Sequence, residues 1–233
     1  MQAIDAAYFS VRSTPGSRVE YRLTIGGTPY GQGSVVGTPR ISGSLYAGNG
    51  PSIGGTVARE IDLQIYPIGM IPRMAEIKLW FRLVSPTGES TEWYPKGVFY
   101  IATRQTDKVT GVLTIHGYDA MLKSEQFYAG DGDTGEWPRP MNEAAAEIAA
   151  AMGLILDPLT AELLNPEYRV EYPNEMTMRE VLGYIAAAHA GNWTVTDAGE
   201  LRLVPLAPAE KVVGHLIEEN GYAIAFGDVR IVV

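Results

Sequence analysis

The chain contains no cysteine. This absence excludes disulfide bonds, iron–sulfur clusters, thiolate zinc sites and cysteine nucleophiles. Packing alone must therefore stabilise the fold. A cysteine-free chain also suits a protein that is assembled in a reducing cytoplasm and later exposed outside a cell.

Positive charge is also scarce. The chain has 18 Lys and Arg against 27 Asp and Glu, which gives a formal net charge of −9, and like charges never cluster in a run of five. Nucleic-acid-binding surfaces need clustered basic residues that displace counterions from phosphates. The composition therefore argues against specific nucleic-acid binding.

Long apolar stretches are missing as well. No segment reaches the roughly 18 apolar residues that a membrane-spanning helix needs. The N-terminus, Met1–Tyr8, has neither the basic region nor the apolar region of a signal peptide. We expect a soluble chain that is not exported by this route and does not insert into a membrane.

Alternating apolar and polar residues dominate the first half of the 233-residue chain. This period predicts half-buried strands at 19–25, 61–65 and 77–83, with a tight turn at Gly26–Gly27. Trp93–Arg104 and Leu113–Lys123 predict two further strands, which we interpret as the closing antiparallel pair of a β-barrel. A short helical segment, Asp119–Glu125, follows them. At least six short strands before residue 125 are typical of a barrel or sandwich.

Residues 31–56 are rich in Gly, Ser and Pro and predict a loop. Gly48–Gly55 could cradle a phosphate, but a phosphate loop lies between a strand and a helix and usually carries a lysine. A strand follows here instead, which favours a simple connection.

The pattern changes after residue 126. Asn142 is predicted to cap a helix that runs to Met152, and Thr177 with Glu180 forms the capping box of a second helix that ends near Gly191. Residues 193–196 and 201–205 predict a β-hairpin. The fold class is therefore α+β: an N-terminal antiparallel β-barrel or sandwich (1–125), followed by a small helix–helix–hairpin domain (126–206). Residues 207–233 are predicted to return to the sheet or to start a truncated second barrel, and we favour the front part of a longer protein.

Few residues suggest chemistry. Asp131, Asp133 and Glu136 form an acidic loop, but they lack the spacing of a helix-flanked calcium loop, so a solvated loop is favoured over a metal site. His116, His189 and His215 are isolated and do not make a zinc site or a catalytic triad. No hydrolase motif is present. We predict no catalytic residue, no metal ligand and no cofactor.

Aromatic residues concentrate between positions 93 and 137. They could form a sugar-stacking platform, or they could form core and subunit contacts. The excess of 13 tyrosines over 5 phenylalanines favours half-buried contact surfaces. The members of this group are Trp93, Tyr94, Phe99, Tyr100, Tyr118, Phe127, Tyr128 and Trp137.

A series of segments between residues 55 and 206 resembles the tail hub (baseplate hub) proteins of tailed bacteriophages and prophages of Gram-positive bacteria. These segments are Arg59–Tyr66, Ile71–Ile77, Glu92–Ile101, Leu113–Asp119, Trp137–Pro138, Tyr172–Pro173, Thr177–Ile185 and Gly191–Trp193. These segments are structural, and it is their order along the chain that is distinctive. They contain no active-site signature.

The resemblance implies a non-enzymatic virion protein with tail-tube-like barrels. Such a hub is a homotrimeric ring at the tail tip that contacts the tail tube, tape-measure and spike or fibre proteins, contributes to host cell attachment, and lets DNA pass without specific binding. It would be assembled in the host cytoplasm. Two alternatives from other classes are a carbohydrate-binding or host-recognition β-domain and a fragment of a cell-wall hydrolase.

Overall fold

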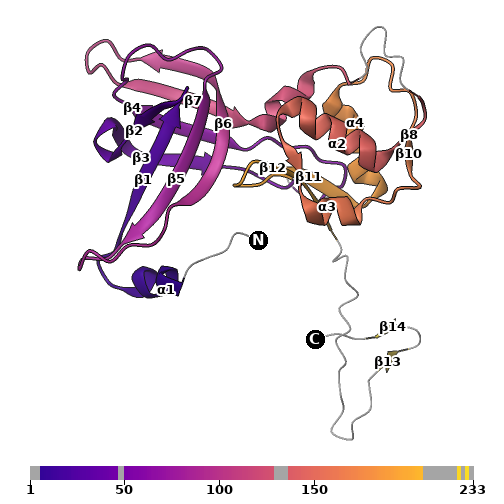
Figure 1. Ribbon diagram of the computed structural model, residues 1–233, viewed down its shortest axis with the longest axis horizontal. Coiled ribbons are helices and arrows are strands. Elements are labelled where there is room, and N and C mark those ends of the chain that lie inside the picture. Colours follow the sequence, from indigo (N-terminus) through magenta and orange to yellow (C-terminus); the bar gives the residue numbers. More distant parts are fainter. Residues whose placement is uncertain (1–5, 47–49, 129–135, 207–224, 227–228, 231–233) are drawn as a thin grey trace, which may run out of the picture.

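The N-terminal half of the chain folds into one seven-stranded antiparallel sheet. The computed structural model describes residues 6–46, 50–128, 136–206, 225–226 and 229–230. The sheet curls strongly (Figure 1), and its strand order is β2-β1-β5-β6-β7-β4-β3. The strands are β1 (Arg18–Ile25), β2 (Thr28–Tyr30), β3 (Val35–Ser42), β4 (Glu60–Ile65), β5 (Glu76–Val84), β6 (Tyr94–Thr106) and β7 (Leu113–Asp119). The strands expected at 19–25, 61–65 and 77–83 are confirmed.

The tight turn between β1 and β2 is also confirmed. Ile25 pairs with Thr28, so only Gly26 and Gly27 form the connection. Their φ angles are 55° and 84°. Two consecutive positive φ angles are the geometry of a type I′ turn, which glycine adopts without steric cost.

The expected loop at 31–56 is partly wrong, because it contains the short 3-10 helix η1 (Gln32–Ser34) and strand β3. Gly37 and Pro39 concealed this strand in the sequence. β3 is an edge strand, and its register against β4 shifts between Val36 and Arg40. Edge strands and bulges tolerate proline because the missing N–H faces away from the ladder.

β6 and β7 pair with each other as expected, but they are not a closing pair. They lie inside the sheet, where β6 also pairs with β5 and β7 also pairs with β4. The edges of the sheet are β2 and β3. Fourteen buried side chains of this half form a first core, among them Leu23, Ile61, Ile77 and Phe99. Helix α1 (Ala6–Ser13), which the sequence pattern did not reveal, contacts β5.

The second half mixes helices with short strands. A 3-10 helix, η2 (Ala120–Glu125), follows β7 directly, and Asp119 caps its N-terminus. This helix confirms the short helical segment predicted at Asp119–Glu125. The remaining elements are β8 (Arg139–Pro140), α2 (Met141–Met152), β9 (Ile155–Leu156), α3 (Pro158–Leu163), β10 (Arg169–Val170), α4 (Met178–Ala188), β11 (Gly191–Val195) and β12 (Glu200–Pro205). Figure 1 shows these helices at the opposite end of the long axis from the curled sheet.

Both predicted helices and the hairpin are present. Gly153 ends α2 in the left-handed conformation, and Thr177 and Glu180 form the capping box of α4. The N-terminal cap of α2 differs from the expectation. Pro140 occupies that position, and Asn142 lies in the first turn. His189 is the C-cap of α4, and Gly191 already begins β11. α3 and the two-residue strands were not foreseen because they are too short to show a period.

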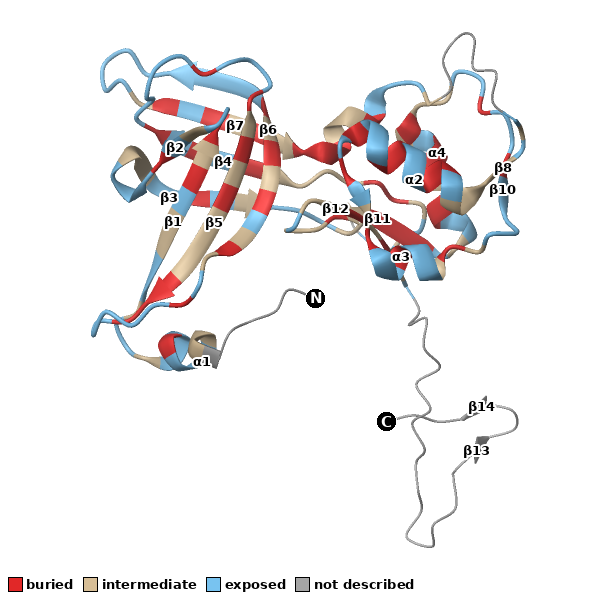
Figure 2. Ribbon diagram, viewed as in Figure 1, coloured by how far each residue is buried: buried red, intermediate tan, exposed pale blue. Residues whose placement is uncertain are grey.

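A second core lies between these elements. It gathers the alanine-rich face of α2, the apolar stripe of α4 and the inner face of β11 and β12, and Figure 2 shows their buried residues in red. Trp193 is fully buried there and donates its indole N–H to the Leu182 carbonyl oxygen at 2.7 Å. Ala120 and Met121 of η2 also belong to this core. η2 therefore connects the curled sheet directly to the second core.

Of the C-terminal stretch, the structure describes only the antiparallel pair β13 (Ala225–Phe226) and β14 (Val229–Arg230). The expectation of returning strands or a second barrel otherwise lies outside the described residues. In the described part of the chain, no helix has both the length and the apolar character to cross a membrane.

Thr177→Ala should destabilise the second half of the molecule by about 1 kcal/mol, because it removes the side chain that caps α4. Urea unfolding followed by the helical circular dichroism signal measures this loss. Thr103→Ala, on an exposed position of β6, is the control and should change the midpoint much less. Equal shifts for the two variants would contradict the role of the capping box.

Candidate functional site

The functional feature that the described residues build is a polar junction between the two cores. The loop between β3 and β4 leaves the sheet and reaches β11. Gly54 donates its N–H to the Gly191 carbonyl oxygen at 2.9 Å, and Trp193 donates to the Gly55 carbonyl oxygen at 2.8 Å. Thr56 pairs with Trp193 as a parallel bridge. A segment of the first half thus pairs, through an isolated parallel bridge, with the small sheet of the second half.

Asn192 holds this segment in place. Its side chain is fully buried and makes two contacts. Oδ1 accepts from the Gly55 N–H at 2.6 Å, and Nδ2 donates to the Ser52 carbonyl oxygen at 2.6 Å. A Cβ at Gly55 would lie 2.7 Å from Oδ1 of Asn192, so only glycine fits there. The glycine-rich segment is therefore the connection that the sequence favoured, and it packs closely on β11.

Arg59 ties the first strand after this loop to the β11–β12 hairpin. Its Nη1 lies 2.5 Å from Oδ1 of Asp197, and its Nη2 donates to the Thr196 carbonyl oxygen at 3.2 Å. The guanidinium carbon also lies 5.6 Å from the ring centroid of Phe99, a member of the first core. One side chain therefore contacts both halves of the molecule.

Asp119 also contacts Arg59, and it is completely buried. One carboxylate oxygen accepts from the Arg59 N–H and the other from the Met121 N–H, each at 3.0 Å. Burial raises the pKa of Asp119, and the hydrogen bonds from the two backbone N–H groups and the charge of Arg59 offset only part of this effect. This carboxyl group fixes the point where β7 passes into η2.

Arg179 of α4 completes the junction. Its Nη1 donates to the Thr56 carbonyl oxygen at 2.5 Å, and its Nε lies 2.6 Å from Glu125 Oε1. These contacts join α4 to the end of η2 and to the loop between β3 and β4, which we call the crossing loop. Such charge-assisted contacts to backbone groups orient the elements that they connect.

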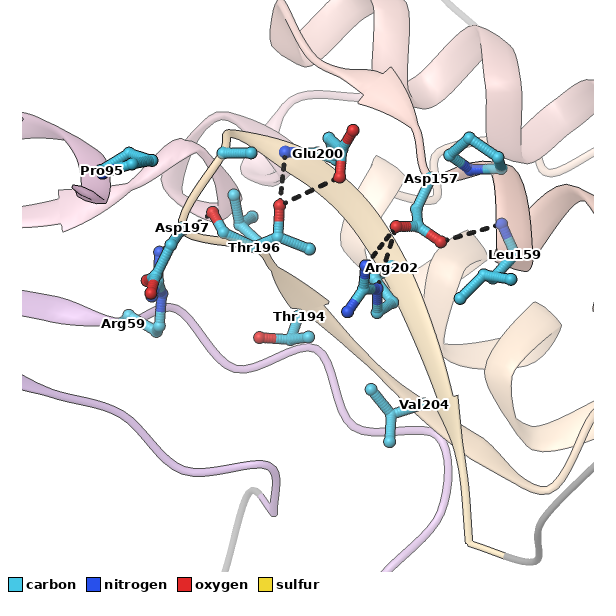
Figure 3. Close-up of a pocket in the computed structure, with 13 residues that line it drawn as sticks. Arg59, Pro95, Asp157, Leu159, Thr194, Thr196, Asp197, Glu200, Arg202 and Val204 are labelled. Carbon is cyan, nitrogen blue, oxygen red and sulfur yellow. Dashed lines mark hydrogen bonds and ion pairs between the residues drawn. The ribbon is translucent and has the colours of Figure 1, made fainter. Parts of the chain in front are cut away.

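A cleft of about 640 Å³ opens beside the junction along β12 (Figure 3). Asp157 and Arg202 pair inside it, with the carboxylate Oδ2 at 3.0 Å from Nε and 2.5 Å from Nη2. The other oxygen of Asp157 accepts from the Leu159 N–H at 3.0 Å and caps α3. Burial acts to raise the pKa of Asp157, but the hydrogen bonds and charge of Arg202 and the N–H groups of α3 outweigh burial and lower it.

Both arginines that line this cleft pair with a carboxylate. Arg59 meets Asp197, Arg202 meets Asp157, and the carboxylate of Glu200 lies 3.4 Å from the Thr196 hydroxyl. Figure 3 shows these contacts within the cleft. The arrangement is that of structural ion pairs, because each of the two arginines is paired with an aspartate on another segment of the chain.

The candidate residues from the sequence are not brought together. His116 pairs with Asp62 across β7 and β4 at 2.7 Å, whereas His189 accepts from the Asn165 N–H at 2.9 Å at the end of α4. His215, Asp131 and Asp133 lie outside the described residues. Within the described ranges, no group of three or more His, Asp or Glu side chains could hold a metal ion.

The aromatic group between residues 93 and 137 divides in two. Tyr94 and Phe99 are buried. Trp93 lies between Arg22 and Arg82, whose guanidinium carbons are 4.8 Å and 4.7 Å from its ring. A second aromatic cluster surrounds Trp137. Its ring packs edge-on against Tyr128 and Tyr172, with ring centroids 5.9 Å and 5.5 Å away.

Sequence reasoning did not identify Asn192, Arg59 or Asp119 as the junction. Asn192 stands between glycine and a buried tryptophan in a strand, and a polar residue with buried neighbours on both sides is the signal that marks it.

The fold is similar to that of phage tail proteins. The 43 kDa tail protein of prophage MuSo2 from Shewanella oneidensis superposes with a TM-score of 0.54 at 16% identity, covering 85% of this chain and 59% of that one. The tail protein from Neisseria meningitidis MC58 superposes with a TM-score of 0.52 at 15% identity, covering 79% of this chain and 51% of that one. This chain thus spans between half and three fifths of their lengths.

No family model and no curated protein sequence matches the chain. The comparisons therefore establish the fold alone. It is an α+β fold with a large curled antiparallel sheet, similar to that of these two tail proteins.

Asn192→Ala should destabilise the folded chain by about 2–3 kcal/mol, because it leaves the buried Gly55 N–H and the part-buried Ser52 carbonyl oxygen without partners. Urea unfolding measures the change. Asn165→Ala, which removes a partly exposed side chain outside the junction, is the control and should cost about 1 kcal/mol or less. A small, equal loss for both variants would show that the junction contributes little.

Asp119 and Asp157 should give opposite pH dependences. The lowered pKa of Asp157 adds stability that is present above its ordinary value of 3.8 and is lost below it. The raised pKa of Asp119 means that the unfolded chain loses this proton at a lower pH than the folded chain does. Ionisation of Asp119 above pH 3.8 therefore opposes folding.

The free energy of unfolding of the wild type minus that of Asp157→Asn should therefore fall as the pH drops below 3.8. The same difference against Asp119→Asn should rise as the pH falls from neutral toward 3.8. Denaturant titrations at a series of pH values measure both. Slopes of the same sign would contradict the assignment.

Proposed function

We propose that the chain is a structural, non-enzymatic component of a phage or prophage tail. The observation that carries this proposal is the superposition on two tail proteins over 85% and 79% of the chain. Two further features support it: the arginines of the cleft along β12 pair with carboxylates of the same chain, and a polar junction holds the two cores together.

Within the tail, the chain acts at the tip as a hub that connects the tail tube to the spike or fibre. Residues 1–125 are the tail-tube-like unit and residues 126–206 the inserted α+β unit, whereas the part predicted for residues 207–233 falls mainly outside the described residues. The hub is a homotrimer. The free edges β2 and β3 suit this assembly, because an edge strand presents unpaired backbone groups to a neighbour.

DNA passes through the ring without being retained. The chain as a whole has a net charge of −9, and net negative charge repels phosphates, which favours release of DNA over binding. The tail tube, the tape-measure protein and the spike or fibre are the neighbours in this arrangement, and the location is the virion, with assembly in the host cytoplasm.

Two measurements test the proposal. Light scattering of the purified chain should give the mass of three copies of the 25.3 kDa polypeptide. Antibodies against the chain should label the distal ends of tails in electron micrographs of induced particles. A monomer that is missing from particles and binds purified cell-wall glycan would overturn the hub and favour the carbohydrate-binding alternative.

A further inference from the structure

The loop between β4 and β5 exposes an unusual amount of apolar surface. Tyr66, Ile68 and Met74 are each about half exposed, and Met70 is 94% exposed. Single exposed apolar side chains are ordinary, but here four of them lie within nine consecutive residues. We call residues 66–74 the apolar loop. Concentrations of exposed apolar side chains mark surfaces that other molecules cover.

The backbone of the apolar loop is held on both sides. Tyr30, a buried residue of the first core, accepts from the Ile68 N–H at 3.2 Å through its hydroxyl oxygen. Arg104 of β6 donates to the Ile71 carbonyl oxygen, and the Ile71 side chain is buried. Met74 has a φ of 55°, a strained value for a residue with a side chain. The exposed side chains are therefore presented by a fixed backbone, which lowers the entropy cost of binding.

The second half of the chain carries a matching hollow. An apolar groove of about 270 Å³ lies between the β10 segment and α4, and Met141, Tyr172, Pro173, Met176 and Tyr184 line it. Tyr172 is 43% exposed and Tyr184 is 58% exposed. Two half-exposed tyrosines at the rim of an apolar groove are typical of protein contact surfaces.

Charge decides which partner fits. Residues 6–128 hold 12 Lys and Arg against 9 Asp and Glu, whereas residues 136–206 hold 4 against 11. Arg73 lies within the apolar loop, and Lys108 is on the β6–β7 hairpin; both are exposed. Glu171 lines the groove, and Glu175 follows nearby in the sequence; Arg169 is the one cation among the groove's lining residues. A basic half with an apolar projection and an acidic half with an apolar groove are complementary surfaces of the same chain.

We propose that the apolar loop of one copy inserts into the apolar groove of a second copy. The sheet and helices α2–α4 lie at opposite ends of the molecule (Figure 1), so the contact joins the sheet end of one copy to the helical end of the next. A contact between two different surfaces closes into a ring when the rotation between copies permits it, and otherwise makes an open filament; the proposed trimer requires the closed case. Met70 is the central side chain of the insertion, because it is the most exposed of the loop, and methionine adapts its shape to irregular grooves. The inference rests on the proposed function, since it names the surfaces through which the hub assembles.

The absence of cysteine makes a direct test possible, because each introduced thiol is the only one in its chain. Met70→Cys is placed in one full-length preparation and Tyr184→Cys in a second one that carries a tag of different mass. The two are mixed and treated with a short bis-maleimide. We expect a covalent heterodimer, resolved from both homodimers by its mass on a denaturing gel.

Val109→Cys is the matched control for Met70→Cys, because Val109 is also 94% exposed but lies on the β6–β7 hairpin. Mixed with Tyr184→Cys, it should give several-fold less heterodimer. Met70→Asp should also lower the oligomeric mass by light scattering, whereas Val109→Asp should not.

Equal heterodimer yields from the Met70 and Val109 positions would overturn the inference. That result would leave the hub intact if the wild type were still a trimer at the tail tip, since another surface would then make the ring. A wild-type monomer that is missing from tails would instead remove the proposed function, whatever the cross-linking shows.

Discussion

The rest of the structure depends on how buried polar groups are matched at the junction of the two cores. The crossing loop carries backbone N–H and carbonyl groups into a region that excludes water, and each such group costs free energy unless it finds a partner. Asn192 satisfies two of them, and the β11 backbone satisfies two more. Arg59 and Arg179 add contacts from the flanking segments. Because these contacts need correct geometry, they fix the sheet and the helices in one relative orientation.

This constraint explains why the described clefts hold structural networks. Arg59 lies between Asp119 and Asp197, and Arg202 neutralises Asp157. Charges engaged in this way orient the segments that carry them. Under the proposed function, this junction between the two cores would keep the shape of the chain while other tail proteins attach to it.

Local patterns in the sequence predicted the regular parts of the fold. Period-two alternation located β1, β4 and β5, and Thr177 with Glu180 located the start of α4, because those features arise from neighbouring residues. β3 was missed because an edge strand accepts the glycine and proline that usually mark a loop. The junction could not be predicted for a different reason. Asn192 and Gly55 are 137 positions apart, and only the fold brings them together.

Hydrogen exchange of the wild-type chain tests the junction most directly. If the junction joins the two cores into one structural unit, the N–H groups of Gly54, Gly55 and Trp193 should exchange as slowly as core N–H groups such as those of Ile61 and Leu182. Mass spectrometry of peptides covering residues 50–59 and 190–195 resolves these rates. Fast exchange of residues 54–56, at the rate of an exposed loop, would show that the crossing segment opens independently and would contradict the account.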